Sequence, residues 1–169
     1  MKQQLKSVIA LFSICAVIAI LMAVTNSITA PFIQKNEDEA AQRALLEVMP
    51  SGESFEKVDL SGVDLPATVQ EVYREQNGGY VFRLKTTGYA SGMVLMCGVN
   101  ADGSVSGAVC LTSSETLGFE ATYGERVKGM NQSTIQSVDT VSGATKTTRA
   151  YKLAVLDALN AFATLTEQS

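Results

Sequence analysis

The first thirty residues contain a nearly uninterrupted hydrocarbon segment, and this feature limits what the chain can fold into more than any other. No charged side chain occurs between Lys6 and Lys35. The apolar run from Val8 to Ile28 is long enough to cross the ~30 Å hydrocarbon core of a bilayer as a helix. The sequence therefore predicts one membrane-spanning helix within residues 1–30, followed by a folded domain.

The charges on the two sides of this segment differ in sign. Lys2 and Lys6 precede it, and three acidic residues follow it at 37–39. Because positive flanks stay in the cytoplasm, we expect a single-pass protein of the cell (inner) membrane, in contact with lipid. Its N-terminus is then cytoplasmic, and its C-terminal domain is periplasmic or extracellular. A cleaved signal peptide is the alternative, but the apolar region is long for one, and cleavage after Ala30 would place bulky Ile28 three positions back.

Composition excludes several classes of function. The chain has no His and no Trp, which rules out Ser-His-Asp and Cys-His catalysis and histidine-based metal sites. Residues 31–169 hold all 17 acidic side chains and eleven of the 13 basic ones, so nucleic acid is not an expected partner. Three cysteines without a CxxC pair do not indicate zinc or an iron–sulfur cluster. We therefore predict no metal ligands and no catalytic residues in this chain.

A polar helix is expected directly after the span. Residues 34–48 carry an apolar stripe at helical spacing, and Pro-Ser-Gly at residues 50–52 ends the pattern. The stripe consists of Ala40, Ala41, Ala44, Leu45 and Val48. We interpret residues 31–50 as a stalk that packs on the domain, and residues 51–169 as the domain itself.

Two hairpins follow, each marked by a turn dipeptide. Asn77-Gly78 and Asp102-Gly103 are strong hairpin signals, and strand-like runs flank both of them. The runs cover residues 68–76, 79–88, 92–99 and 104–112.

The two cysteines of the domain lie on either side of the second turn. With that turn, residue 95 faces Cys110 and Cys97 faces residue 108, so the cysteines share one face of the hairpin diagonally. This geometry suits small core hydrophobes better than a disulfide.

The C-terminal third of the chain is predicted to be helical. Residues 118–131 have the composition of a short helix or lid. The apolar pattern of about residues 147–165 predicts a helix buried against the sheet. The expected fold class is α+β, an antiparallel sheet with packed helices, preceded by a single N-terminal transmembrane helix.

Four small residues, Ser-Gly-Ala-Thr at 142–145, precede this last helix. The start of a helix leaves backbone N–H groups unpaired and carries partial positive charge, and small residues let an anion approach it. Lys146 and Arg149 add positive charge, and Thr147 and Thr148 add caps or further donors. The segment suits a phosphate group, but an ordinary N-cap fits the same residues and is favoured on physical grounds alone.

Residues 139–145, Asp-Thr-Val-Ser-Gly-Ala-Thr, closely resemble the flavinylation motif of the FMN-binding domain in the RnfG and NqrC subunits of ion-translocating redox complexes. A second pattern of that family is Gly-Tyr, a strand, Asp-Gly, a strand, and then Glu-Thr-Pro-Gly-Leu-Gly. It has counterparts at residues 88–92, 102–103 and 115–120. The sequence departs from the family where Pro, Leu and Gly are usual, at Leu117, Phe119 and Glu120.

The resemblance implies covalent FMN, joined through its phosphate to the hydroxyl of Thr145 by the flavin transferase ApbE. We accordingly expect cofactor-binding roles at the helix mouth and in the upstream loop, for Ser142, Gly143, Ala144, Lys146, Thr148, Glu115, Thr116 and Leu117. Without the resemblance, residues 113–116 merely end a strand. Met93, Met96 and Tyr89 could line the same pocket, although Met at strand spacing is more typical of a core.

The function implied by the resemblance is that of a covalently flavinylated electron carrier, closest to RnfG, in a membrane ferredoxin:NAD⁺ oxidoreductase that moves ions. Such a redox subunit of a translocase relays electrons on the outer face of the membrane. It depends on the other membrane subunits of an Rnf-type complex and is not expected to be active alone. The alternatives are an NqrC-like subunit of a Na⁺-translocating NADH:quinone reductase, a stand-alone anchored flavoprotein, and a membrane-anchored binding module without flavin.

Overall fold

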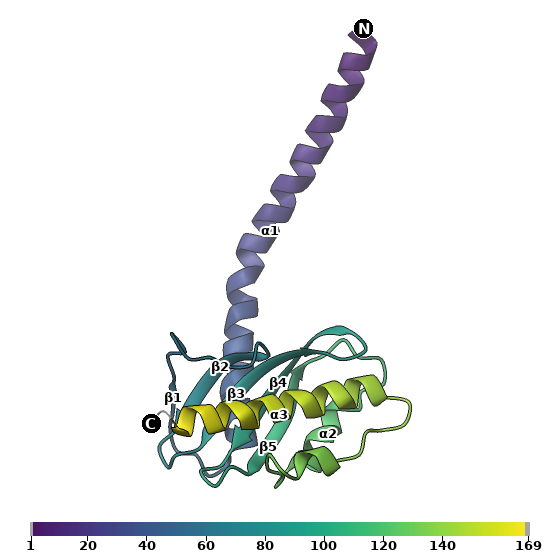
Figure 1. Cartoon of the computed structure of the whole chain (residues 1–169). Coiled ribbons are helices and arrows are strands. Elements are labelled where there is room, and N and C mark those ends of the chain that lie inside the picture. Colours follow the sequence, from purple (N-terminus) through teal and green to yellow (C-terminus); the bar gives the residue numbers. More distant parts are fainter. Residues whose placement is uncertain (1, 168–169) are drawn as a thin grey trace. The chain divides into compact units, whose positions relative to one another are not determined.

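The computed structural model describes the backbone of residues 2–167 and the side chains of residues 11–31, 35 and 39–167. The chain divides into two compact units, Met1–Ala40 and Ala41–Ser169. The first unit is helical, and the second contains a sheet with helices packed on it (Figure 1).

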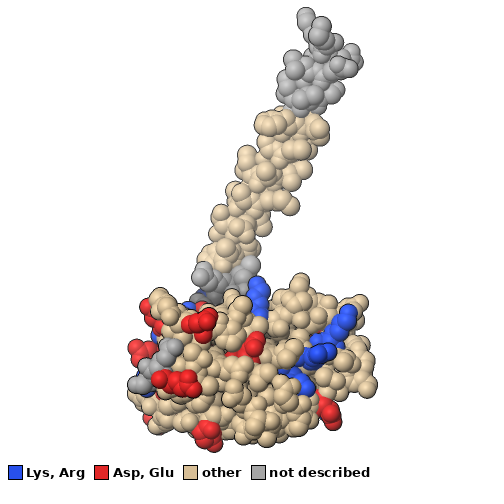
Figure 2. Space-filling model, viewed as in Figure 1, with Lys and Arg blue, Asp and Glu red and all other residues tan. Residues whose placement is uncertain are grey.

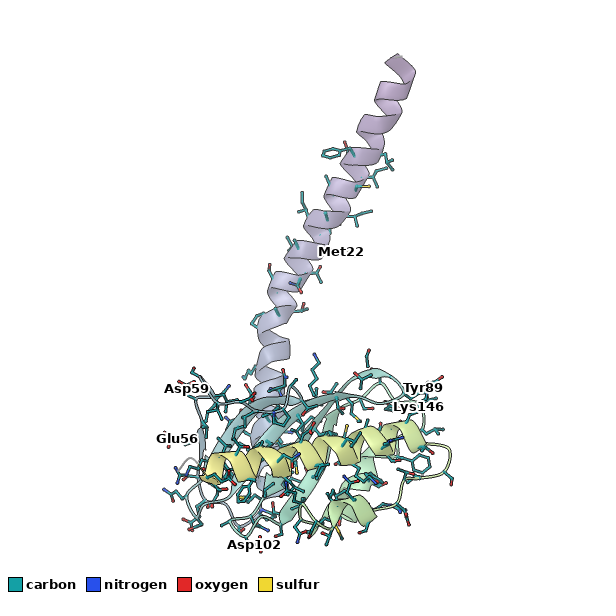
Figure 3. All side chains as sticks on the ribbon, in the orientation of Figure 1. Met22, Glu56, Asp59, Tyr89, Asp102 and Lys146 are labelled. Carbon is teal, nitrogen blue, oxygen red and sulfur yellow. The ribbon has the colours of Figure 1, made fainter. Side chains whose placement is uncertain are left out.

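Helix α1 (Lys2–Val48) supplies the whole of the first unit. Within it, Leu11–Pro31 is a stretch of 21 residues that is long and apolar enough to cross a bilayer. Its large apolar side chains are exposed, with Phe12 at 74 % and Met22 at 71 %, and Figure 3 shows Met22 projecting from the helix. The predicted candidate for a membrane span is therefore present, and the helix continues through Pro31.

Hydroxyl groups near the end of this stretch bond to the helix itself. Thr25 Oγ1 donates to Leu21 O at 2.8 Å, and Ser27 Oγ donates to Ala23 O at 2.9 Å. A hydroxyl that donates to the carbonyl four residues earlier leaves no donor unpaired in hydrocarbon. These polar residues are thus compatible with a membrane-spanning helix.

The second unit is built on a five-stranded antiparallel sheet in which each strand pairs with the next along the chain (Figure 1). The strands are β1 (Phe55–Lys57), β2 (Val69–Glu75), β3 (Tyr80–Thr87), β4 (Ser91–Val99) and β5 (Val105–Thr112). Both predicted hairpins are present, and Gly78 and Gly103 have φ angles of 92° and 79°, which favour glycine. The sequence does not predict β1, because three residues are too few to show a strand period.

The pairing of β4 with β5 at the two cysteines is the pairing that the sequence predicts. Leu95 lies opposite Cys110, and Cys97 lies opposite Ala108. Cys97 is buried in the core and Cys110 is partly buried, and both are free thiols. Desolvation raises the pKa of the Cys97 thiol to about 12. Cys97 therefore behaves as a small core hydrophobe.

One face of the sheet is covered by helices α2 (Glu120–Val127) and α3 (Thr145–Glu167) and by the 3₁₀ turn η1 (Ile135–Ser137). Figure 1 shows α3 lying across the strands. The largest fully buried side chains of this core include Phe82, Leu84, Met93, Leu95, Tyr123 and Tyr151. The rings of Tyr123 and Tyr151 meet edge to face with centroids 5.4 Å apart. The predicted α+β fold is confirmed.

The last two turns of α1 cover the opposite face of the sheet. Four of the five stripe residues are buried there, and Ala40 is exposed. Ser106 Oγ donates to the carbonyl oxygen of Val48 at 2.6 Å, and a Cβ atom at Gly98 or Gly107 would lie 2.9 Å from that oxygen. The sheet thus accepts the end of the helix because it carries glycine where the two backbones meet.

Candidate functional site

A cavity of about 460 Å³ opens where the beginning of α3 meets two loops of the sheet. Its size lies within the usual range for small-molecule sites. The wall combines the β3–β4 turn, the segment between β5 and α2, and the first turn of α3. The lining residues are Tyr89, Glu115, Thr116, Leu117, Phe119, Glu120, Gly143, Ala144, Thr145, Lys146 and Thr147.

The turn that leads into α3 is held by its own hydrogen bonds. Gly143 has a φ of 85°, which lets the chain reverse before the helix. The Ala144 amide donates to Val141 O at 3.0 Å. The hydroxyl of Thr148 accepts from the Val141 amide at 3.1 Å and donates to Ala144 O at 2.9 Å. Thr148 therefore closes the turn from inside, and it leaves the first turn of α3 facing the cavity.

The hydroxyls of this turn differ in their availability. Thr147 and Thr148 are 5 % and 0 % exposed, and the Thr147 hydroxyl donates to Glu115. Thr145 is exposed, and its hydroxyl makes only a long hydrogen bond of 3.4 Å to Val141 O. Among the hydroxyls of residues 142–148, that of Thr145 is the one that is both exposed and part of the cavity wall.

Glu115 ties the three parts of the wall together. Its Oε1 accepts from the Ala90 amide at 3.0 Å, and its Oε2 accepts from the Thr147 hydroxyl. A Cβ atom at Gly88 would overlap Glu115 Oε1 and would lie 3.1 Å from Thr147 Cα. The close packing at Gly88 and the two hydrogen bonds fix the Glu115 carboxylate in place, so its first role is architectural.

The second carboxylate of the wall belongs to Glu120, the first residue of α2. Glu120 is 7 % exposed, and its Oε2 atom has no hydrogen-bond partner. Both carboxylates influence Cys110: burial, and next the negative charge of Glu120, raise the pKa of that thiol to about 11, and Glu115 adds to the effect. The wall therefore carries buried negative charge beside the core.

The outer rim of the cavity is apolar and aromatic. Tyr89 and Leu117 are 71 % and 59 % exposed, and Phe119 is partly exposed beside them. Lys146 Nζ lies 5.9 Å from the centroid of the Tyr89 ring, and Figure 3 shows the two side chains next to each other. Large exposed apolar side chains that gather at a cavity indicate a ligand or partner site.

Basic side chains gather over the beginning of α3 on the face shown in Figure 2. The sequence places Lys146, Arg149 and Lys152 in these turns. Together with the partial positive charge of the helix start, they make this end of an acidic domain suitable for an anion.

The structure brings together seven of the nine predicted site residues in the cavity wall, namely Glu115, Thr116, Leu117, Gly143, Ala144, Thr145 and Lys146. It places Ser142 on the surface next to the cavity and Thr148 in the interior. Tyr89 lines the cavity, whereas Met93 and Met96 are buried in the two cores.

Four wall residues are absent from the nine predicted site residues, namely Tyr89, Phe119, Glu120 and Thr147, and of these only Tyr89 was considered from the sequence as a lining residue. A signal for Thr147 was available in the sequence. The buried stripe of α3 contains Tyr151, and counting back from it by four and by seven residues reaches Thr147 and Ala144. Phe119 and Glu120 lie within the matching segment 115–120, but nothing in the pattern distinguishes their contacts.

Comparison with known families gives two matches. Residues 88–160 match the FMN-binding domain, and residues 1–48 match the RnfG N-terminal region. The two matches lie in the chain order expected from the resemblance, and together they cover well over half of the chain.

The chain therefore contains an RnfG N-terminal region followed by an FMN-binding domain. It is 33 % identical over 125 residues to the G component of the Na⁺-translocating ferredoxin:NAD⁺ oxidoreductase complex of Acetobacterium woodii. The alignment covers 66 % of this chain and 60 % of that relative, so the chain matches a little over half of the relative's length.

The cavity of this FMN-binding domain fits FMN. The first turn of α3 offers backbone N–H groups, Lys146 and small residues to a phosphate. The exposed rim of Tyr89, Leu117 and Phe119 offers apolar surface to a planar ring system. The unpaired Oε2 of Glu120 offers an acceptor to a ligand donor. The residues present therefore agree with the cofactor that the family binds.

Proposed function

We propose that this chain is a covalently flavinylated electron carrier in which the phosphate of FMN is esterified to Thr145. The observation that carries the proposal is the availability of this one hydroxyl. Thr145 is exposed in the cavity wall, whereas Thr147 and Thr148 are buried and hydrogen-bonded. A flavin transferase of the ApbE type would attach the cofactor.

The residues around Thr145 have distinct tasks in this proposal. The start of α3 stabilises the remaining charge of the phosphodiester, with help from Lys146. Gly143 and Ala144 have no bulky side chain and let the phosphate approach the backbone. Thr148 supports the turn from the interior, and Ser142 lies exposed beside the phosphate site. Glu115, Thr116 and Leu117 shape the far wall. FMN itself supplies the one- and two-electron chemistry, and the protein supplies position and electrostatics.

The name of the relative supports a place for this chain in a larger assembly. The Acetobacterium woodii protein belongs by name to a ferredoxin:NAD⁺ oxidoreductase complex that translocates Na⁺. We propose that this chain is the corresponding subunit of an Rnf-type complex. It would relay electrons to and from other membrane subunits, and it would have no turnover by itself.

Orientation completes the proposal. Lys2 and Lys6 precede the apolar helix and acidic residues follow it, which supports a cytoplasmic N-terminus and a flavin domain on the outer face. Protease added to intact spheroplasts should then degrade the chain beyond about Lys35 and leave the N-terminal helix protected. Degradation only after the membrane is opened would contradict this orientation.

The decisive experiment replaces Thr145 by Ala in the full-length chain, produced together with a flavin transferase. Intact-mass spectrometry should show the wild type heavier by FMN less one water, and Thr145→Ala should lack this addition. Thr122→Ala is the matched control, because Thr122 is an exposed threonine of α2 outside the cavity wall. It should retain the flavin, since Thr122 neither lines the cavity nor lies at the start of α3.

Two results would contradict the proposal. One is a Thr145→Ala variant that still carries the added mass. The other is a wild type, purified from its native host, that never carries it. The second result would favour a binding module in which FMN is held without a covalent bond or is absent.

A further inference from the structure

Glu120 is the carboxylate of the cavity wall that has an oxygen without a hydrogen-bond partner in the protein. Its side chain is 7 % exposed, and Oε2 has no hydrogen-bond partner. In the part of the chain that the structure describes, the ion pairs of the sheet join Glu71 to Lys57 and to Arg83, and neither reaches Glu120. Glu115, by contrast, accepts hydrogen bonds at both oxygens. An unpaired buried carboxylate oxygen is unfavourable, so the position of Glu120 needs a cause.

The helix that Glu120 begins does not supply this cause. A negative charge in the first turn of α2 is favoured by the helix dipole, but that interaction works equally well at an exposed position. It also leaves Oε2 without a partner. Glu125, later in the same helix, is exposed and outside the cavity, as most glutamates on a surface helix are. The burial of Glu120 beside the cavity is therefore a property of the cavity.

Among the residues that the structure describes, no cation neutralises Glu120. Lys146, the basic side chain of the wall, lies over the Tyr89 ring on the rim. Glu120 influences the titration of Cys110: after burial, its charge is the next cause that raises the pKa of this thiol. Glu120 therefore lies close enough to Cys110 to disfavour the thiolate, and no described cation is paired with it.

We propose that Glu120 is a positioning residue of the flavin pocket whose carboxylate lowers the reduction potential of the bound FMN. This inference rests on the proposed function, because it requires FMN in this cavity. The free oxygen accepts a hydrogen bond from a donor of the cofactor. The charge opposes the negative charge that the cofactor gains on reduction. Glu115 contributes less, because hydrogen bonds from Ala90 and Thr147 already stabilise its charge.

The half-reaction determines the direction of the effect. At neutral pH, uptake of two electrons and one proton leaves the flavin one unit more negative than before. An ionised Glu120 disfavours this product in a poorly solvated wall. Replacing it with Gln keeps the shape and removes the charge, so the potential should rise. We expect the oxidised-to-reduced equilibrium to shift about tenfold, which equals about 30 mV for a two-electron couple.

The experiment uses the full-length flavinylated chain in detergent. Wild type, Glu120→Gln, Glu120→Asp and Glu125→Gln are produced with the transferase, and the covalent FMN is quantified by intact mass. Each protein is then titrated at pH 7 with dithionite, which supplies the electrons, in the presence of a reference dye, and flavin absorbance gives the potential. Glu125→Gln is the matched control, because it removes the same charge from an exposed position of the same helix.

The expected result is a more positive potential for Glu120→Gln and a smaller change for Glu120→Asp, which keeps the charge. Glu125→Gln should have the wild-type potential. Equal potentials for wild type and Glu120→Gln would overturn the inference, and so would an equal rise in Glu125→Gln. If Glu120→Gln does not accumulate with bound flavin, Glu120→Ala removes the charge without leaving a buried polar group, and the same criterion applies to it.

The outcome for the proposed function is read separately. If wild type carries no FMN mass, the proposed function fails, and this inference fails with it. If wild type carries the mass and the potentials are equal, the proposed function stands and the role of Glu120 is refuted.

Discussion

The two sides of the first turn of α3 carry the same kind of residue and place it in opposite environments. Thr145 lies exposed in the cavity wall, whereas Thr147 and Thr148 are buried. The buried threonines use their hydroxyls to hold Glu115 and the turn at Val141. The exposed one keeps a weakly bonded hydroxyl that a ligand can reach.

This difference shows that the position of a threonine on the helix decides whether it stabilises the turn or is available for attachment of a ligand. The residue type alone does not decide this. Ala144, Thr147, Thr148 and Tyr151 are buried and follow the spacing of one helical face. Thr145 falls outside that face. Support and attachment should therefore be separable by mutation, with large effects on stability from one side and small effects from the other.

The largest loss of stability is expected from Gly88→Ala, which disturbs the buried contacts between Gly88, Glu115 and Thr147. The new Cβ would overlap Glu115 Oε1 and press on Thr147 Cα, so Glu115 must move and lose hydrogen bonds from Ala90 and Thr147. Overpacking of this kind costs about 2–3 kcal/mol in the free energy of unfolding. Denaturant titration of the detergent-solubilised protein, followed by circular dichroism, measures the loss.

Ser91→Ala provides the control for that measurement, since Ser91 is exposed in the same hairpin. Its free energy of unfolding should stay within about 0.5 kcal/mol of the wild-type value. An unchanged midpoint for Gly88→Ala would mean that the contact between the hairpin and the helix start does not support the fold.

A smaller but clear loss is expected from Thr148→Val, which keeps the shape and removes the hydroxyl. The Val141 amide then loses its acceptor in a partly buried turn, while Ala144 O still accepts from the Thr148 amide. A buried donor left unsatisfied costs about 1–3 kcal/mol, and we expect about 1 kcal/mol here because the turn is only partly buried. The folded fraction should still gain the mass of FMN, because Thr145 is intact. Loss of the flavin with unchanged stability would instead assign the chemistry to Thr148.

Much of the fold could be predicted from the sequence, because the residue patterns that specify its turns and strands are local. Asn77-Gly78 and Asp102-Gly103 specify turns through their own backbone preferences, and the strands alternate around them. The register at Cys97 and Cys110 follows from the second turn without further information. Strand β1 has only three residues and no such turn, and its pairing with β2 depends on tertiary packing.

The functional site could be predicted from the sequence only in part. The resemblance of residues 139–145 and 115–120 leads to the right cavity, since a motif specifies residues that act together. The motif does not specify burial. The inward position of Thr148 follows instead from the helical face that it shares with Tyr151. The burial of Glu120 with an unpaired oxygen depends on contacts between segments that are distant in the sequence.

The smallest effect is expected from Thr145→Ala, measured this time as stability. Both this variant and wild type are produced without the transferase, so neither carries FMN and only the side chain differs. The lost hydrogen bond is long, at 3.4 Å, the residue is exposed, and Val141 O still accepts from the Ala144 amide. The free energy of unfolding should therefore change by less than about 0.5 kcal/mol, as is usual for exposed positions.

The same denaturant titration compares Thr145→Ala with Thr148→Val. A loss as large as that of Thr148→Val would mean that Thr145 also supports the turn, and the failure of Thr145→Ala to carry flavin would then have a structural explanation. A negligible loss, together with a missing FMN mass, leaves attachment as the role of this hydroxyl.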